Sequence, residues 1–328
     1  MISPYTITET MLNLVQEISA YVTKLSLEKR ELHLRKENRI RSIQSSLAIE
    51  NNSLSLEQVT DIIEGRRVLG TPKDIHEVQN AYEAYERAFR LNPYAVDDFL
   101  LAHGLLTQGL VKSPGQFRSG DVGVFDGQGQ VVHVGARPQF VPNLLADLFD
   151  WARDSQVSML VKSSIVHFEL EIIHPFEDGN GRMGRLWQSL LLSQWNPIFE
   201  WLPIESVIYH HQQGYYAALS QSNDANDSTV FIEFMLSAIL ETLQMYSLKN
   251  SLTKMSELMS EKEATIFNLV STYLTQHDGI TSRQLQELAG VSSATARRYL
   301  VKFVELGLLQ ATGQTKSRHY YLASGNET

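Results

Sequence analysis

The chain has 328 residues and contains no cysteine. Disulfide bonds, thiolate zinc sites and a cysteine nucleophile are therefore excluded, and the absence fits a reducing compartment, so we expect a cytoplasmic protein. Long apolar stretches are also missing, because the longest runs are interrupted within a few residues and none reaches the ~20 residues that span a bilayer. We therefore expect no membrane partner.

Positive charge is also scarce over the chain as a whole. The 28 basic residues are outnumbered by 37 acidic ones, which gives a formal net charge of −9. This balance argues against indiscriminate binding of nucleic acid by the whole molecule, but it leaves room for a local basic patch. One basic stretch, residues 29–41, is interpreted as the solvated face of a helix.

Most of the chain is predicted to be helical, because apolar residues recur at helical spacing. Ser55 offers an N-cap for one helix, and another is expected over residues 73–89. The glycine-rich stretch 113–138 differs, because it contains two β-prone runs, 122–125 and 131–134, around the turn signal DGQG. We therefore expect one β-hairpin in an otherwise helical region.

The last part of the chain, from Ser251, predicts three helices followed by two strands around a basic turn. With a turn at Gly290 between its second and third helices, it resembles a winged helix-turn-helix domain. Residues 281–323 contain six basic and two acidic residues, a local charge of +4. The candidate DNA contacts on the third helix and the turn are Arg297, Arg298, Lys316 and Arg318. The same pattern also fits a protein-docking or dimerisation module.

The densest group of polar residues is HPFEDGNGRMGR, at 174–185. It combines a histidine, two carboxylates, three glycines, an asparagine and two arginines, a composition that a buried core would not use. Each piece alone is common in turns, but their co-occurrence indicates a ligand site. The three glycines, Gly179, Gly181 and Gly184, spell G-x-G-x-x-G, with Glu200 about twenty residues on, as in a dinucleotide-binding fingerprint. That fingerprint needs a preceding strand, whereas the preceding segment has helical spacing.

A metal face is a second alternative. His167, Glu171 and His174 lie at i, i+4 and i+7, and zinc accepts such ligands. However, His174 precedes Pro175, where the helix should be ending. A core or interface histidine is therefore the better interpretation of His167.

A third interpretation explains most of the motif. One helix ends near His174 and a second begins after the turn, so the backbone N–H groups of residues 179–182 form an anion cradle. Arg182 and Arg185 are three residues apart and can clamp phosphates from one side. Asp178 can hold a hard cation such as Mg²⁺. His174 can accept a proton from a hydroxyl near neutral pH.

At every defined position this segment matches H-P-F-x-D/E-G-N-G-R-x-x-R, the signature of the Fic family. The resemblance spans roughly residues 40–245. The hairpin resembles the family's target-docking flap, and GYYAAL at 214–219 resembles its tyrosine-bearing segment beside the adenine. The resemblance implies transfer of AMP from ATP, with Mg²⁺, to a Ser, Thr or Tyr hydroxyl of a protein, including the enzyme itself.

The resemblance also implies a role for each residue of the motif. His174 would be the general base, Phe176 would anchor the loop in the core, and Asp178 would bind Mg²⁺. Attack on the α-phosphorus would be in line, with catalysis by positioning and charge stabilisation. The implied nucleotide contacts are Gly179, Asn180, Gly181, Arg182, Arg185, Tyr215 and Tyr216.

Many Fic proteins carry an inhibitory S/T-x-x-x-E-G/N segment whose glutamate pairs with the second arginine of the motif. Two stretches of this chain fit, one with its glutamate at Glu50 and one with its glutamate at Glu64. The first is favoured by its longer family context, SSLAIENN. Its inhibitory residues would be Ser46, Glu50 and Asn51.

These features predict a mainly α chain: a Fic helical fold with a β-hairpin flap, and then a small α+β winged-helix domain. The expected domains are 1–90 with the inhibitory helix, 91–250 as the Fic core, and 251–328. The expected function is protein adenylyltransferase, autoinhibited by Glu50 at Arg185. Two alternatives stay open: a DNA-binding regulator that senses nucleotide in the Fic pocket, and a Fic enzyme that mainly removes AMP. The candidate partners are ATP, a target protein docking at the 122–134 hairpin, DNA, and a second copy of the chain.

Overall fold

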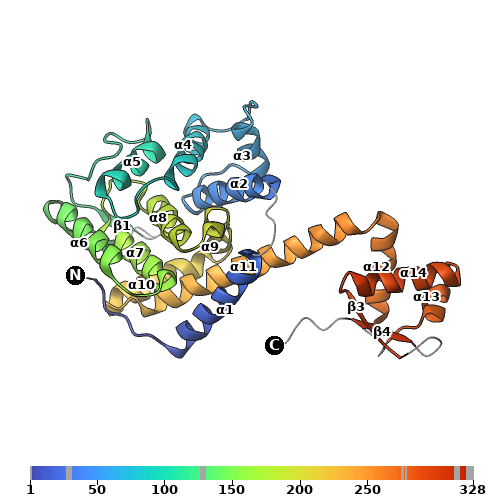
Figure 1. Ribbon diagram of the computed structural model, residues 1–328. Helices are drawn as coiled ribbons and strands as arrows, with labels where there is room; N and C mark the ends of the chain where they lie inside the picture. The colour runs from blue at the N-terminus through green and yellow to red at the C-terminus, as the bar shows by residue number, and fades with distance from the viewer. Residues whose placement is uncertain are drawn as a thin grey trace. The chain divides into compact units, whose positions relative to one another are not determined.

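The protein's computed structural model describes residues 2–26, 32–125, 131–274, 277, 279–313 and 318–322. The chain divides into two compact units, Met1–Tyr246 and Ser247–Thr328, and both are mainly helical (Figure 1). The elements that begin in the first unit are, in chain order, α1 (Glu9–Ser26), α2 (Leu32–Ile49), α3 (Leu56–Ile63), α4 (Pro72–Ala88), α5 (Val96–Thr107), β1 (Gly123–Phe125), β2 (Val131–Val134), the 3-10 helix η1 (Pro138–Phe140), α6 (Val141–Asp154), α7 (Met159–Ile173), α8 (Asn180–Trp195), η2 (Pro197–Glu200), α9 (Ile204–His210), α10 (Gln212–Ala225) and α11 (Thr229–Leu258).

The central element of the first unit is α8, which is surrounded by other helices (Figure 1). Every residue from Arg182 to Leu192 is buried, including two arginines and a glutamine. Apolar side chains such as Trp187 join it to the core, and the buried polar ones need partners from neighbouring helices because an unpaired buried polar group is costly. Burial of α8 therefore fixes where the motif's arginines can be satisfied.

Helices α7 and α8 approach each other closely at Gly184. A Cβ atom at this position would lie 2.6 Å from Cδ2 of His167 and 2.9 Å from Oε1 of Glu171, both on α7. Only glycine therefore fits without moving α7. The contact sets the spacing of the two helices and hence the span of the loop between them.

Two of the predicted boundaries have visible local causes. Ser55 caps α3 by accepting a hydrogen bond from the backbone of Gln58, whose side chain bonds back to Ser55, as a capping box requires. Strands β1 and β2 pair antiparallel, with Gly123 opposite Val134 and a register irregularity at Val124/Phe125. The turn at 126–130 lies outside the described residues.

One helix departs from the expectation drawn from the apolar runs. Residues Thr229–Ser247 of α11 are long and apolar enough to cross a membrane by length and composition alone, and half of this stretch is buried inside the protein. Its buried residues, such as Phe231, Met235 and Ile239, pack in the core of the first unit. A core helix passes the same test, so this is weak evidence for a span.

The second unit is built from α12 (Glu261–Leu274), α13 (Ser282–Ala289), α14 (Ser293–Glu305), β3 (Leu309–Thr312) and β4 (His319–Leu322). Gly290 ends α13 in the left-handed conformation (φ 62°), and α14 starts soon after it. The strands pair antiparallel, and Ile280 forms a bridge to Tyr320 of β4. This unit has a core of its own, which includes Leu300 and Phe303. Residues 314–317, including Lys316, lie outside the described part of the chain.

Candidate active site

The motif loop begins where α7 ends, at His174. This residue caps α7 in the left-handed conformation (φ 53°, ψ 63°), and its N–H donates to the carbonyl of Leu170 at 3.0 Å. For a residue with a side chain this conformation is uncommon, and such residues are often found at functional sites. The loop that follows spans residues 175–179, and Gly179 (φ 85°) is the N-cap of α8.

A buried arginine outside the motif holds the backbone around His174. Arg118 is 4% exposed and lies in the glycine-rich segment before β1. Among the residues that the structure describes, its guanidinium donates to the backbone carbonyls of His174 at 2.7 Å, Gly120 at 2.7 Å, Ile173 at 3.3 Å, and Ala136. Its own N–H donates to the carbonyl of Pro175. No periodicity or motif in the sequence pointed to this residue.

The His174 ring is placed to act as a base. Its Nδ1 lies 3.3 Å from the carbonyl of Glu171, so Nδ1 carries the hydrogen and donates. The lone pair is then on Nε2. Burial lowers the pKa of His174, and the nearby Glu171 carboxylate opposes this only in part. The imidazole is therefore neutral at neutral pH, the form that accepts a proton.

A second histidine packs against the motif loop. The ring of His103, on α5, stacks on the buried Phe176 with centroids 3.6 Å apart and the planes 1° from parallel. Burial lowers the pKa of His103 to about 4, so the ring is neutral. Its Nδ1 accepts from the N–H of Gly115 at 3.0 Å, and its Nε2 therefore donates to the carbonyl of Asp178 at 3.0 Å. Sequence reasoning singled out Phe176 but not this partner.

Asn180 and Asp178 differ in how free their side chains are. The Asn180 amide bridges the loop, accepting from the N–H of Phe176 and donating to its carbonyl, both at 2.9 Å. A nucleotide contact by Asn180 would therefore come from its backbone. The Asp178 carboxylate is 52% exposed and accepts from the N–H of Gly179 at 2.6 Å. This carboxylate lies at the edge of the N-terminus of α8. Proteins usually bind Mg²⁺ through one or two carboxylates together with phosphate oxygens of the substrate.

The two arginines of the motif are both buried, but they have different partners. Arg182 is 3.1 Å from Asp178 and 3.7 Å from Glu77, and within the described part of the chain its Nε has no hydrogen-bond partner. Arg185 forms its hydrogen bonds with residues at the end of α2. It donates to the Ser46 hydroxyl at 3.1 Å, to the Ser46 carbonyl at 3.0 Å and to the Glu50 carboxylate at 2.8 Å.

This arrangement separates the two glutamates that fitted the inhibitory pattern. Glu50 pairs with Arg185, and although burial alone would lower the pKa of Arg185, the Glu50 charge raises it overall. Glu64 instead forms exposed pairs with Lys36 and Arg66. Asn51 follows in the left-handed conformation (φ 66°) and ends α2 by donating its N–H to the carbonyl of Ala48. The Glu50 carboxylate also crowds Gly181, where an added Cβ would collide with it.

The two tyrosines expected beside the nucleotide are placed differently. Tyr215 is 1% exposed, and its hydroxyl lies 3.1 Å from Nε2 of His167 and 3.4 Å from Glu171. Tyr216 is 47% exposed and close enough to Glu50 for that charge to help raise its pKa, after burial. An adenine contact from this pair would therefore come through Tyr216.

Both alternatives for the motif are wrong. His167 is fully buried, with Nδ1 at 2.7 Å from Gln188, and within the described ranges no group of three or more His, Asp or Glu side chains could hold a metal ion. The G-x-G-x-x-G stretch follows helix α7 rather than a strand, and both strand pairs that the structure describes are antiparallel. A dinucleotide fold needs parallel strands.

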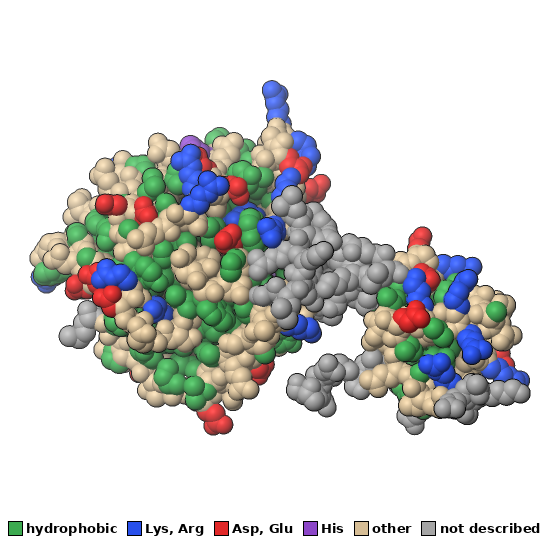
Figure 2. All heavy atoms as spheres, in the orientation of Figure 1, with side chains coloured by type: hydrophobic (Ala, Val, Ile, Leu, Met, Phe, Trp, Pro, Cys, Tyr) green, Lys and Arg blue, Asp and Glu red, His purple; other side chains and the backbone are tan. Residues whose placement is uncertain are grey.

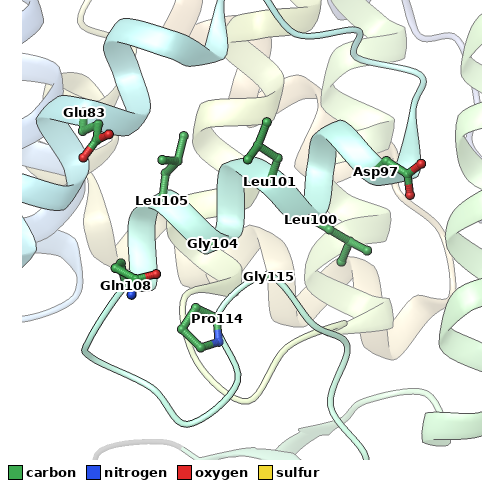
Figure 3. A pocket seen from close by; sticks show the side chains of 9 residues that line it. All are labelled: Glu83, Asp97, Leu100, Leu101, Gly104, Leu105, Gln108, Pro114 and Gly115. Atoms are coloured by element: carbon green, nitrogen blue, oxygen red, sulfur yellow. The ribbon is translucent and has the colours of Figure 1, made fainter.

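A separate hollow of about 520 Å³ lies on the outer side of α5 (Figure 3). It is lined by leucines of α5, by Glu83 of α4 and by Pro114 and Gly115 of the following loop. No residue of 174–185 lines it, so it is distinct from the motif loop.

Three basic residues of the second unit, Arg297, Arg298 and Lys302, lie on α14. Arg297 and Arg298 are exposed, and Lys302 pairs with Glu263 at 2.9 Å. Arg318 lies over the ring of Tyr320, 5.5 Å from its centroid. Several Lys and Arg side chains gather on the face of this unit seen in Figure 2.

Comparisons with known proteins concern the family of the chain as a whole. The sequence model of the Fic/DOC family matches residues 93–192. The chain is similar to a probable protein adenylyltransferase of Aquifex aeolicus, 24% identical over 83% of this chain and 82% of that protein. It is also similar to the protein adenylyltransferase fic-1 of Caenorhabditis briggsae, 30% identical over 61% of this chain, but this match spans only 40% of the nematode protein.

Among solved structures, the chain is similar to a protein of Desulfovibrio desulfuricans G20 whose crystal structure is described as that of a Fic family protein. The two are 39% identical, the match covers all of both chains, and the TM-score is 0.74. The similarity therefore includes both units of the chain and not only the segment around the motif.

Proposed function

The chain belongs to the Fic family, and from this membership we propose that it is a protein adenylyltransferase that transfers AMP from ATP to a hydroxyl of a protein, itself included. The observation that carries the proposal is the His174 ring, whose Nδ1 donates to the Glu171 carbonyl and leaves the lone pair on Nε2, one loop away from the N-terminus of α8 and its two buried arginines. A nucleotide sensor would need the cradle but not the base.

In the proposed reaction, the hydroxyl oxygen of the target attacks the α-phosphorus of ATP. The bond from that phosphorus to the bridging oxygen breaks, pyrophosphate leaves, and the hydroxyl proton passes to Nε2 of His174. The N–H groups at the start of α8 hold phosphate oxygens, with Arg182 beside them and Arg185 at the γ-phosphate. Asp178 would hold Mg²⁺, which neutralises phosphate charge when it is bound.

We propose that the protein is autoinhibited by the contact between Glu50 and Arg185. While the guanidinium is bound to Glu50 and Ser46, it is not available to the γ-phosphate, and the carboxylate adds negative charge beside Gly181. ATP bound under these conditions has its α-phosphate misplaced for attack. A misplacement of 1 Å costs on the order of a hundredfold in rate.

The test is transfer of label from α-labelled ATP with Mg²⁺ to the protein itself. We expect little transfer by the wild type, about a hundredfold more by Glu50→Gly, and none by Glu50→Gly/His174→Ala. Glu64→Gly is the matched control, because Glu64 lies in exposed pairs away from Arg185. Activation by Glu64→Gly with none by Glu50→Gly would refute the assignment of the Glu50–Arg185 contact as the autoinhibitory contact, or brake. Release of AMP from modified protein by the wild type, but not by Glu50→Gly, would favour the reverse reaction.

Two further surfaces belong to the proposal. The β1–β2 pair would act as the flap that docks a target segment by backbone pairing, since strand addition to a sheet edge needs no particular side chains. The second unit, with its three helices and its strand pair, would be a winged helix. The exposed Arg297 and Arg298 on α14 favour DNA as its ligand, with α14 in the major groove.

A further inference from the structure

A buried carboxylate outside the motif attaches α2 to the rest of the first unit. Glu205, on α9, is 1% exposed. Its two oxygens accept from two hydroxyls on different helices, Ser42 of α2 at 2.8 Å and Tyr85 of α4 at 3.0 Å. Burying a carboxylate is costly unless it is well hydrogen-bonded. A charge in this place therefore constrains the helices that supply its donors.

Further contacts connect Glu205 with the pair of Glu50 and Arg185. Tyr85 is buried, which raises the pKa of its hydroxyl well above the usual value, so it stays a neutral donor to Glu205. The Ser46 hydroxyl lies close enough to that of Tyr85 to lower its pKa, against the larger effect of burial. Ser46 in turn accepts from Arg185 at 3.1 Å. Close contacts therefore lead from Glu205 through Tyr85 and Ser46 to the arginine that Glu50 binds.

The spacing along α2 explains what these contacts do. Ser42, Ser46 and Glu50 are four residues apart, so they lie along one face of the helix. The apolar contacts of α2, through residues such as Ile43 and Leu47, favour burial but are not directional. Hydrogen bonds are directional, so the bond from Ser42 to Glu205, whose other oxygen is held by Tyr85, favours one height and one rotation of α2. A change of either would carry Glu50 away from Arg185.

We propose that Glu205 and Tyr85 are positioning residues of the brake, which hold α2 at the height and rotation where Glu50 meets Arg185. The proposal rests on the proposed autoinhibition, and it adds that the inhibited state is set from α4 and α9, outside the inhibitory segment. Neither residue belongs to the 174–185 motif or to the 46–51 segment.

The first measurement is hydrogen–deuterium exchange, which does not depend on activity. Glu205→Ala removes the acceptor of both Ser42 and Tyr85, and we expect the amides of residues 46–52 to exchange about 10- to 100-fold faster, as loss of one hydrogen bond to a charged group implies. Exchange in α8 should stay near the wild-type rate. An unchanged rate at 46–52, or an equal acceleration in every helix, would overturn the proposal.

The matched control is Glu169→Ala. Glu169 is also a buried carboxylate, 6% exposed, and it accepts from the N–H of Ser3 rather than from α2. We expect this variant to leave exchange at 46–52 unchanged. The milder Tyr85→Phe keeps the ring in the core and removes one hydroxyl, so it should accelerate exchange at 46–52 by a smaller factor. If Glu205→Ala does not fold, Tyr85→Phe decides the question by the same criterion.

The second measurement links this positioning to function. Self-modification from α-labelled ATP should rise in Glu205→Ala, whereas a merely destabilised core would lower it. In the Glu50→Gly background the same substitution should give no further rise, because the brake is already released. Faster exchange at 46–52 without label in any variant would support the positioning role and count against AMP transfer. An active Glu50→Gly beside an inactive Glu205→Ala would overturn only the positioning role.

Discussion

The first turns of α8 and the exposed face of α14 both carry arginines, but in opposite surroundings. The side chain of Arg185 is 1% exposed and makes three hydrogen bonds to the end of α2. Arg297 and Arg298 are exposed, and within the described ranges neither forms an ion pair with a carboxylate. Arg185 is already paired and must be released before it can bind a ligand, whereas Arg297 and Arg298 can bind one directly.

The difference predicts how sensitive each region is to change. In the motif, Asn180, Arg182 and Arg185 are buried and bound to named partners, so the loss of one should produce a large and specific effect. On α14 the charges act from the surface, where single interactions are weak and screened by salt. Substitutions in the two regions should therefore differ by orders of magnitude.

The largest effect is expected at His174. In the active Glu50→Gly background, His174→Ala should lower the rate of AMP transfer by about 100- to 10,000-fold, the range of general-base catalysis. With His174 present, the rate should fall only as the pH drops below about 6.5, because burial lowers the pKa and the base is the neutral form. Rates at saturating ATP from pH 5 to 8 test this. A rate that already falls as the pH is lowered from 8 to 7 would contradict the lowered pKa of His174.

Arg118 tests whether the support of the loop matters as much as the motif itself. Arg118→Lys keeps the charge but cannot reach several carbonyls at once, so the backbone at His174 should shift. In the Glu50→Gly background we expect kcat to fall about 10- to 100-fold, the cost of a small misplacement, with KM for ATP little changed. Arg137→Lys, in the same segment, is the control. Equal losses in both variants would show that Arg118 has no special role.

His103 gives an intermediate effect, on stability. Its pKa is about 4 in the folded protein and about 6.5 when unfolded, so the stability it contributes is present above pH 6.5 and is lost as the pH falls towards 4. Between pH 7.5 and pH 5 this amounts to about 2 kcal/mol. Denaturant unfolding of the wild type and of His103→Gln at both pH values isolates the contribution of His103 to the free energy of unfolding. An equal pH dependence in the two proteins would refute it.

The smallest effect is expected on α14. Arg297→Ala and Arg298→Ala should each weaken binding of duplex DNA several-fold, and each should reduce the slope of log affinity against log salt by about 1 if it contacts a phosphate. Arg283→Ala on α13 is the control, because Arg283 is paired with Glu287. Titration of labelled duplex at several salt concentrations measures both quantities. No binding at low salt would remove DNA as the ligand.

The sequence predicted what is local, and it could not predict what depends on packing. The mainly helical fold and the family follow from periodicity and from twelve consecutive residues, 174–185. The pairing of Glu50 with Arg185 followed from a family pattern that already favoured Glu50, and the structure places Glu64 in pairs with Lys36 and Arg66 instead. Arg118 and Glu205 carry no local signal, because an arginine in a loop and a glutamate on a helix are usually solvated. Their roles arise from segments distant in sequence.

The burial of Arg185 has a consequence for how the protein responds to nucleotide. In the proposed reaction Glu50 and the γ-phosphate bind the same guanidinium, so the end of α2 would act as a tethered competitor of ATP. For a segment tethered in the same chain the effective concentration is of the order of millimolar. The concentration of ATP needed for half-maximal rate should then depend on how firmly α2 is held. Loss of any bond that holds α2 would shift the dose–response curve towards lower ATP.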